Sequence, residues 1–153
     1  MEDLKDYPNY QEGDSILDID TSDAVKPSAV EAGEYQIRIT GQRKATDSNG
    51  VQKVVRIGDT GNQYFIITFD IPSEEASKNF SKIFSVPSEA MEPKRRNSAK
   101  WAIEEFKRCF DLLDLNWTTM IGKTGYTLLS KVDKGEYGEQ NEIAKFLIPT
   151  VNY

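Results

Sequence analysis

The chain has 153 residues, of which 10% are aromatic and 29% charged, and its formal net charge is −6. This length and composition are expected for one globular domain. There is no histidine and a single cysteine, Cys109, which excludes an intramolecular disulfide and argues against nucleophilic triads and zinc sites.

The N-terminal sequence MEDLKDYPNY lacks the positive start and apolar stretch of a secretory signal. No apolar run approaches the roughly 18 residues that a membrane span requires. A lone cysteine fits a reducing compartment. We therefore expect a cytoplasmic protein that is not an enzyme and binds no metal or cofactor.

Charge is unevenly distributed. Residues 1–34 hold ten acids and two lysines, a charge of −8, whereas the remaining 119 residues hold 17 basic and 15 acidic side chains. Apolar residues are sparse before residue 30, which predicts an acidic, flexible arm over residues 1–29 and a folded domain over residues 30–150. The segment SILDID, Ser15 to Asp20, has an alternative interpretation as an added strand or a partner peptide.

Order is expected to begin at Ala32-Gly33. Tyr35, Ile37 and Ile39 alternate with polar residues, which predicts a strand extending to about Lys44. TDSNG (46–50) predicts a turn. VQKVVRIG (51–58) predicts a short strand segment, and further strands are predicted over residues 63–71 and 79–87.

The period then changes to that of a helix over Asn97–Leu115, with Asn97 or Ser98 as its N-cap. Its apolar stripe is predicted to consist of Ala102, Ile103, Phe106, Cys109, Phe110 and Leu113. Strands return at residues 125–134 and 141–149, separated by a turn at GEYGEQ.

This order favours a mainly β fold, a five-stranded oligonucleotide/oligosaccharide-binding (OB) Greek-key barrel with one α-helix between strands 3 and 4. Gly41 stands where the long first strand would bend or bulge. A five-stranded α+β sheet with one helix on its face fits the same order.

The segment NFSKIFSVP (79–87) is the first candidate site. If Ile83 points inward, Phe80, Lys82 and Phe84 share the opposite face, where rings could stack on bases and the ammonium could meet phosphate. Alternatively, the two phenylalanines belong to the core. Tyr64 on the neighbouring strand would extend the stacking surface.

Basic residues form the second candidate group, since backbone phosphates require such charges. Solvated strand edges also carry Lys and Arg, which is the alternative interpretation. Tyr137 lies between glycines in a loop and is a candidate for stacking. The basic candidates are Arg38, Arg43, Lys44, Lys53, Arg56 and Lys131.

Three segments carry a resemblance: AGEYQIRI, GNQYFIITFDI, and IGKTGYTLLSKVDKGEYGEQNEIAKFLIP. With the mid-chain helix, they resemble a family of small phage-encoded OB-fold single-stranded DNA-binding proteins of replication and recombination. The similarity covers roughly residues 32–149. Familiar single-strand binders end in an acidic tail that recruits partners, whereas this chain ends IPTVNY and has its acids at the other end.

The resulting hypothesis is a phage single-stranded DNA-binding protein that binds through a basic groove and aromatic stacking, with little sequence preference. The acidic arm would compete with DNA for the groove or bind replication and recombination proteins. A homo-oligomer is compatible with this hypothesis. The alternative is a non-enzymatic protein-interaction module on the same barrel, such as a phage accessory or host-inhibitor protein.

Overall fold

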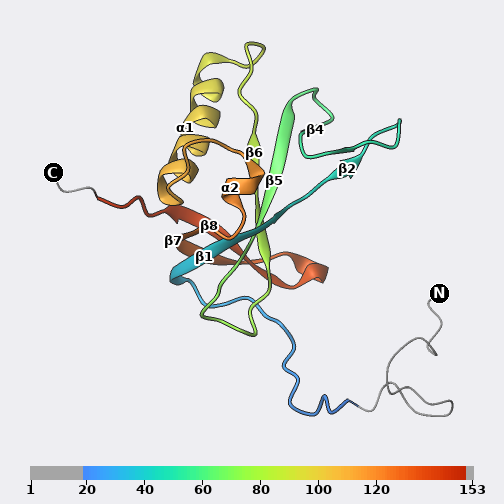
Figure 1. The fold of residues 1–153 in the computed structure, drawn as a ribbon, viewed down its shortest axis with the longest axis vertical. Coiled ribbons are helices and arrows are strands. Elements are labelled where there is room, and N and C mark those ends of the chain that lie inside the picture. The colour runs from blue at the N-terminus through green and yellow to red at the C-terminus, as the bar shows by residue number, and fades with distance from the viewer. Residues whose placement is uncertain (1–18, 151–153) are drawn as a thin grey trace.

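The computed structural model describes residues 19–150. It confirms a mainly β fold with one main helix, α1 (Pro93–Cys109), between the third and fourth long strands (Figure 1). The long strands are β1 (Gly33–Gln42), β5 (Gln63–Asp70), β6 (Phe80–Ser85), β7 (Thr124–Asp133) and β8 (Glu139–Phe146). The short elements are β2 (Ala45–Thr46), β3 (Gln52–Lys53), β4 (Arg56–Ile57), α2 (Trp117–Met120) and a 3-10 turn (Gly135–Tyr137).

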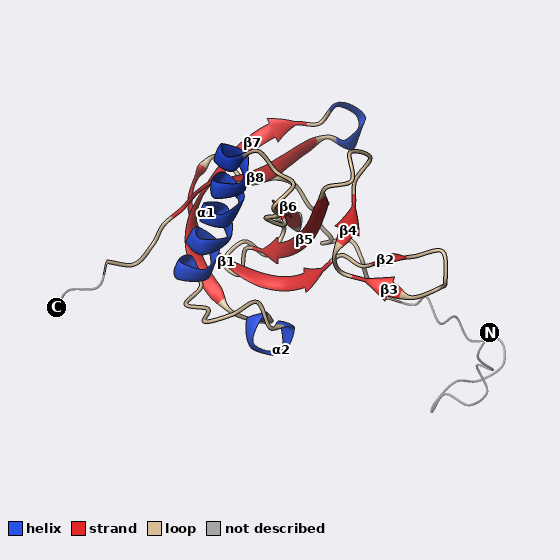
Figure 2. Cartoon of the chain, turned by 90° about the horizontal axis from the view of Figure 1, so that it is seen from above, coloured by secondary structure: helices blue, strands red, loops and turns tan. Residues whose placement is uncertain are grey.

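The long strands form one antiparallel sheet in the order β6-β5-β1-β7-β8. This sheet curls so that its two end strands, β6 and β8, lie close together, and α1 runs along one side (Figure 2). Within residues 19–150, no hydrogen-bonded ladder joins β6 to β8. The sheet is therefore not closed, and we call the line between β6 and β8 the seam.

Strand β1 has a bulge at the predicted position. Its register with β5 pairs Ile39 with Phe69 and then skips to Gly41 opposite Thr68. A Cβ atom at Gly41 would lie 2.7 Å from Thr68 Oγ1, which is closer than such atoms can approach. A larger residue would have to displace the Thr68 hydroxyl, so glycine suits the position where β1 bends to pair with both β5 and β7.

The core consists of the inward faces of the strands and one face of α1. Ile37 and Ile39 of β1 are buried, as are Phe65, Ile67 and Phe69 of β5. At the centre is a cluster of rings whose centroids are 5.0–6.5 Å apart, formed by Phe69, Phe84, Phe106, Phe110 and Phe146. Such aromatic packing dominates the burial of a small domain.

The helix differs from its prediction at both ends. It begins at Pro93 instead of near Asn97, because proline suits the first helical turn, where its missing N–H needs no partner. It ends at Cys109 with a Schellman motif, in which the Leu112 N–H donates to the Lys107 carbonyl at 2.8 Å. Asp111 takes the left-handed conformation there, with φ 54°.

The early helix end moves Leu113 off the predicted apolar stripe. Its side chain is 96% exposed, whereas Phe106, Cys109 and Phe110 are buried as predicted. The prediction that Leu113 belongs to the core is wrong, because the helical period on which it depended stops four residues earlier.

Two leucines provide a matched test of this core. Leu129 on β7 is 2% exposed, so Leu129→Ala should lower the free energy of unfolding by about 2–5 kcal/mol through lost burial and a residual cavity. Leu113→Ala deletes the same atoms at a solvent-exposed position and should change the free energy of unfolding by less than about 0.5 kcal/mol. Urea unfolding measures both values, and similar losses for the two variants would contradict this packing.

Candidate functional site

A groove of about 360 Å³ runs along the seam. Residues of β6 form one side of it and residues of β8 the other, while Arg43 reaches it from just beyond the end of β1. Its lining includes three cationic side chains and one acidic side chain, namely Arg43, Lys82, Lys134 and Glu142.

The charge of this groove is positive. Lys134 is paired with Glu142, so these two charges offset each other. Among the described residues, neither Arg43 nor Lys82 has a carboxylate oxygen within 4.0 Å. The groove thus presents two uncompensated cations, which suits an anionic ligand.

Lys82 occupies an unusual position for a lysine. It alternates with Phe80 and Phe84 and so shares the inward face of β6. Its ammonium lies 5.5 Å from the ring centroid of Phe84 and 5.9 Å from that of Phe146, within cation–π range. Because β8 does not pair with β6, this inward position still opens into the groove.

The structure corrects the predicted orientation of β6. The exposed stacking surface required Ile83 to point inward, but Ile83 lies opposite Ile66 on the outer face and is 61% exposed. Phe80 and Phe84 were expected to form an exposed stacking surface, but both are buried against the ring cluster. That prediction is wrong because these two rings complete the core, the alternative that sequence analysis had left open.

Tyr137 lies on the 3-10 turn between β7 and β8, and its side chain is 73% exposed. Lys134, which follows β7, and Gln140 of β8 line the groove. The turn therefore places an exposed aromatic ring beyond one wall of the groove. The exposure of Tyr137 agrees with its predicted position in a loop.

A second hollow, of about 410 Å³, lies beside the β2–β3 hairpin. Its lining includes three further residues that were predicted to bind nucleic acid: Lys53, Arg56 and Tyr64. Lys53 is paired with Asp47 at 3.3 Å, and Arg56 Nη2 donates to the Lys44 carbonyl at 3.2 Å. Lys53 and Arg56 thus each have a partner in the β2–β3 region, while the Lys44 side chain is exposed.

Arg38 is also engaged. Its guanidinium donates two hydrogen bonds to Asp70 directly across the β1–β5 ladder, with Nε to Oδ1 at 3.1 Å. These bonds, together with the negative charge of Asp70, raise the pKa of Arg38 above its usual range. The pair is close to neutral overall and is a weak candidate for binding phosphate.

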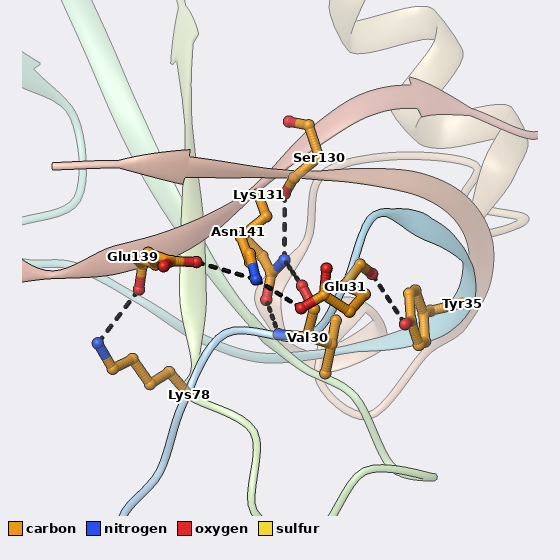
Figure 3. Close-up of polar contacts among 8 residues, drawn as sticks. All are labelled: Val30, Glu31, Tyr35, Lys78, Ser130, Lys131, Glu139 and Asn141. Atoms are coloured by element: carbon orange, nitrogen blue, oxygen red, sulfur yellow. Dashed lines mark hydrogen bonds and ion pairs between the residues drawn. The ribbon is translucent and has the colours of Figure 1, made fainter.

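Lys131 forms an ion pair with Glu31 and a second with Glu139 (Figure 3). Hydrogen bonds to Glu31 and then to Glu139 raise the pKa of the Lys131 ammonium. Its charge is more than offset by these two carboxylates. Sequence spacing gave no indication of this cluster, because Glu31 is 100 residues away.

Asn141 attaches the start of the domain to β8 (Figure 3). The Val30 N–H donates to Asn141 Oδ1 at 2.9 Å, while Asn141 Nδ2 donates to the carbonyls of Val30 and Ser130 at 2.9 and 3.1 Å. Asn141 is buried, and asparagine is depleted in strands. That depletion is the one sequence signal that could have singled it out.

Contacts with the domain begin earlier than predicted. Order was expected from Ala32, but Ser28 already forms a parallel bridge with Ser77. The Ser28 N–H donates to the Ala76 carbonyl at 3.0 Å, and the Lys78 N–H donates to the Ser28 carbonyl at 2.9 Å. Residues 1–18, which include most of the predicted acidic arm and of SILDID, lie outside the described residues.

Within residues 19–150, no helix is both long and apolar enough to cross a membrane. No group of three or more potential metal-ligating acids or cysteines occurs in that same range. Comparison with protein-family models and with curated protein sequences gives no match.

Asn141→Ala should release the segment that precedes β1. Loss of the acceptor for Val30 N–H should bring hydrogen exchange of that amide close to its unprotected rate. Loss of the donor to the part-buried Ser130 carbonyl should lower the free energy of unfolding by about 1–3 kcal/mol. Asn79→Ala is the control, because Asn79 is exposed and donates no side-chain hydrogen bond among the described residues. Equal Val30 protection in both variants would contradict the attachment.

Proposed function

We propose that this chain is a non-enzymatic single-stranded DNA-binding protein and that the groove along the seam is its binding site. The observation that carries the proposal is the pair of uncompensated cations, Arg43 and Lys82, in an open groove with an exposed apolar residue, Ile83, on its β6 side. Single-strand binders combine positive grooves that follow the backbone with apolar or aromatic surfaces for bases.

The fold that we propose is a partly open OB barrel. Five long antiparallel strands, a bulge in the first, and a helix between the third and fourth support it. In this interpretation the seam between β6 and β8 is the line at which the barrel would close. The resemblance to phage replication and recombination proteins supports the same role, in the host cytoplasm.

In the proposed complex, phosphates lie against Arg43 and Lys82, whereas Lys134 is already paired with Glu142. Bases face the exposed apolar surface of Ile83 and stack on Tyr137 at the turn. Every base offers a π-face, so binding should tolerate sequence changes, and it should weaken as salt rises. Arg38 and Lys131 contribute little, since carboxylates already engage them.

A protein-interaction module is the second candidate function. It is favoured by an apolar hollow of about 380 Å³ between α1 and the hairpin region, whose lining includes Val54, Val55, Ile103 and Leu115. A partner side chain could fill such a hollow. Under this function, the groove variants described next would leave single-stranded DNA binding absent or unchanged.

Matched double variants test the groove. Arg43→Gln with Lys82→Gln should weaken binding to oligo-dT and reduce the slope of log K against log salt by about 0.7 per charge removed. Arg38→Gln with Lys131→Gln removes the same charge from engaged positions and should leave the slope nearly unchanged. Fluorescence titration over several salt concentrations measures both, and equal slopes would refute the proposed location.

Two exposed tyrosines test the stacking role. Tyr137→Ala should cost about 1–3 kcal/mol of oligo-dT binding free energy, the usual contribution of one base–aromatic stack. Tyr126→Ala is the control, since Tyr126 is also exposed but lies on β7 opposite Gln36. If both variants bind like the unmodified chain, the turn does not contact bases.

A further inference from the structure

The exposed side of α1 carries lysines around a tryptophan. Trp101 is 49% exposed, although tryptophan is on average highly buried in folded proteins. Lys94 precedes it by seven residues and Lys100 by one, and both lysines are exposed. Residues seven apart lie on the same side of an α-helix, about 10.5 Å apart along its axis. Lys94 and Trp101 therefore share one face of α1, with Lys100 at the margin of that face.

These two lysines are not neutralised by neighbouring acids. Among the described residues, neither Lys94 nor Lys100 has a carboxylate oxygen within 4.0 Å. Arg96 and Arg108 of the same helix, in contrast, each form an ion pair, at 2.8 and 3.1 Å. The helix as a whole contains six basic and two acidic side chains. It is thus a positively charged element in a chain whose net charge is negative.

The indole ring of Trp101 is supported from one side. The Arg108 guanidinium lies over the ring, 5.4 Å from its centroid and within cation–π range. Arg108 is itself held by Glu104, to which its Nε donates at 3.1 Å. Because Trp101 is nevertheless half exposed, its ring keeps accessible surface on which another planar group can stack.

The combination of ring and lysines favours one class of ligand. Cations alone attract any anion, and an exposed ring alone suits many planar groups. A single-stranded nucleic acid satisfies both, since its phosphates meet ammonium groups and its bases stack on aromatic rings. A duplex would use only the charges, because its bases are already stacked within the double helix.

The groove and the helix are neighbours across the ring cluster. Lys82 of the groove lies over the rings of Phe84 and Phe146. Both rings contact Phe106, which is on the buried side of α1. The helix runs along the outside of the curled sheet (Figure 2), and an α-helix with its side chains is about 10–12 Å across. A strand that continues beyond the groove therefore has to pass round one helix to reach Trp101.

We infer that the exposed face of α1, formed by Trp101 with Lys94 and Lys100, is a second contact surface for single-stranded DNA. This inference rests on the proposed function, because the same strand that fills the groove continues over the helix. Its consequence is a dependence on length. A short oligonucleotide occupies the groove alone, whereas a long one occupies both surfaces.

Tryptophan fluorescence tests the stacking in the full-length chain. The probes are oligo-dT of about 8 nucleotides, within the range that one OB fold covers, and of about 30 nucleotides. The long probe should quench the emission and the short one should not, because only the long one reaches Trp101. Trp101→Phe should abolish the quenching, since the remaining Trp117 packs against the core. Trp101→Ala should weaken binding of the long probe roughly 5- to 150-fold, the effect of one base–aromatic stack, and leave the short probe unaffected.

Matched pairs of lysines test the charges. Lys94→Gln with Lys100→Gln should reduce the slope of log K against log salt by about 1.4 for the long probe, at about 0.7 per charge, and leave the slope for the short probe unchanged. Lys123→Gln with Lys145→Gln is the control. Both control lysines are exposed, have no carboxylate within 4.0 Å among the described residues, and lie next to β7 and on β8. Equal reductions in the two variants would overturn the inference.

The two probes separate this inference from the proposed function. If the short probe binds through Arg43 and Lys82 but the long probe does not quench Trp101, the inference is overturned and the proposed function stands. If the long probe quenches Trp101 while the short probe does not bind, contact at α1 is supported and the groove is refuted. If neither probe binds at any salt concentration, both proposals are overturned.

Discussion

Ring packing, not hydrogen bonding, holds the two end strands of the sheet together. Within residues 19–150, β6 and β8 share no ladder, yet Phe84 and Phe146 lie with ring centroids 6.5 Å apart, and both contact Phe106 of α1. The helix therefore acts as the element that keeps the curled sheet from spreading. A hydrogen-bonded ladder between β6 and β8 would have left no groove. The candidate site therefore exists because ring packing, and not strand pairing, joins these two strands.

The absence of a ladder between β6 and β8 also explains why Lys82 has no carboxylate partner, unlike Arg38 and Lys131. On the paired strands, cations such as Arg38 and Lys131 lie next to acids across a ladder or at a hairpin, and ion pairs engage them. At the seam no β8 residue pairs with Lys82 to neutralise it, and its ammonium lies over the rings of Phe84 and Phe146 instead.

Local patterns in the sequence predicted the strands, the order of elements and the bulge at Gly41, because alternation and glycine placement are local signals. They failed where a distant segment decides the outcome. The alternation of Phe80, Lys82 and Phe84 indicated a solvent-exposed face. The structure instead has an inward lysine, which is tolerated because no neighbouring strand pairs with this edge of β6. The end of α1 was missed because Asp111, not glycine, adopts the left-handed turn. Glu31, which pairs with Lys131, and Val30, which is held by Asn141, are each at least 100 residues from their partner, beyond the reach of any periodicity.

The attachment of Val30 to Asn141 also has a consequence during synthesis. Their separation of 111 residues means that the last strand must leave the ribosome before Asn141 can hold Val30. Contacts of such high sequence separation form late and slowly in folding. Residues 28–30 would therefore be fixed in two stages, Ser28 by residues 76–78 when β5 and β6 assemble, and Val30 only when β8 is complete.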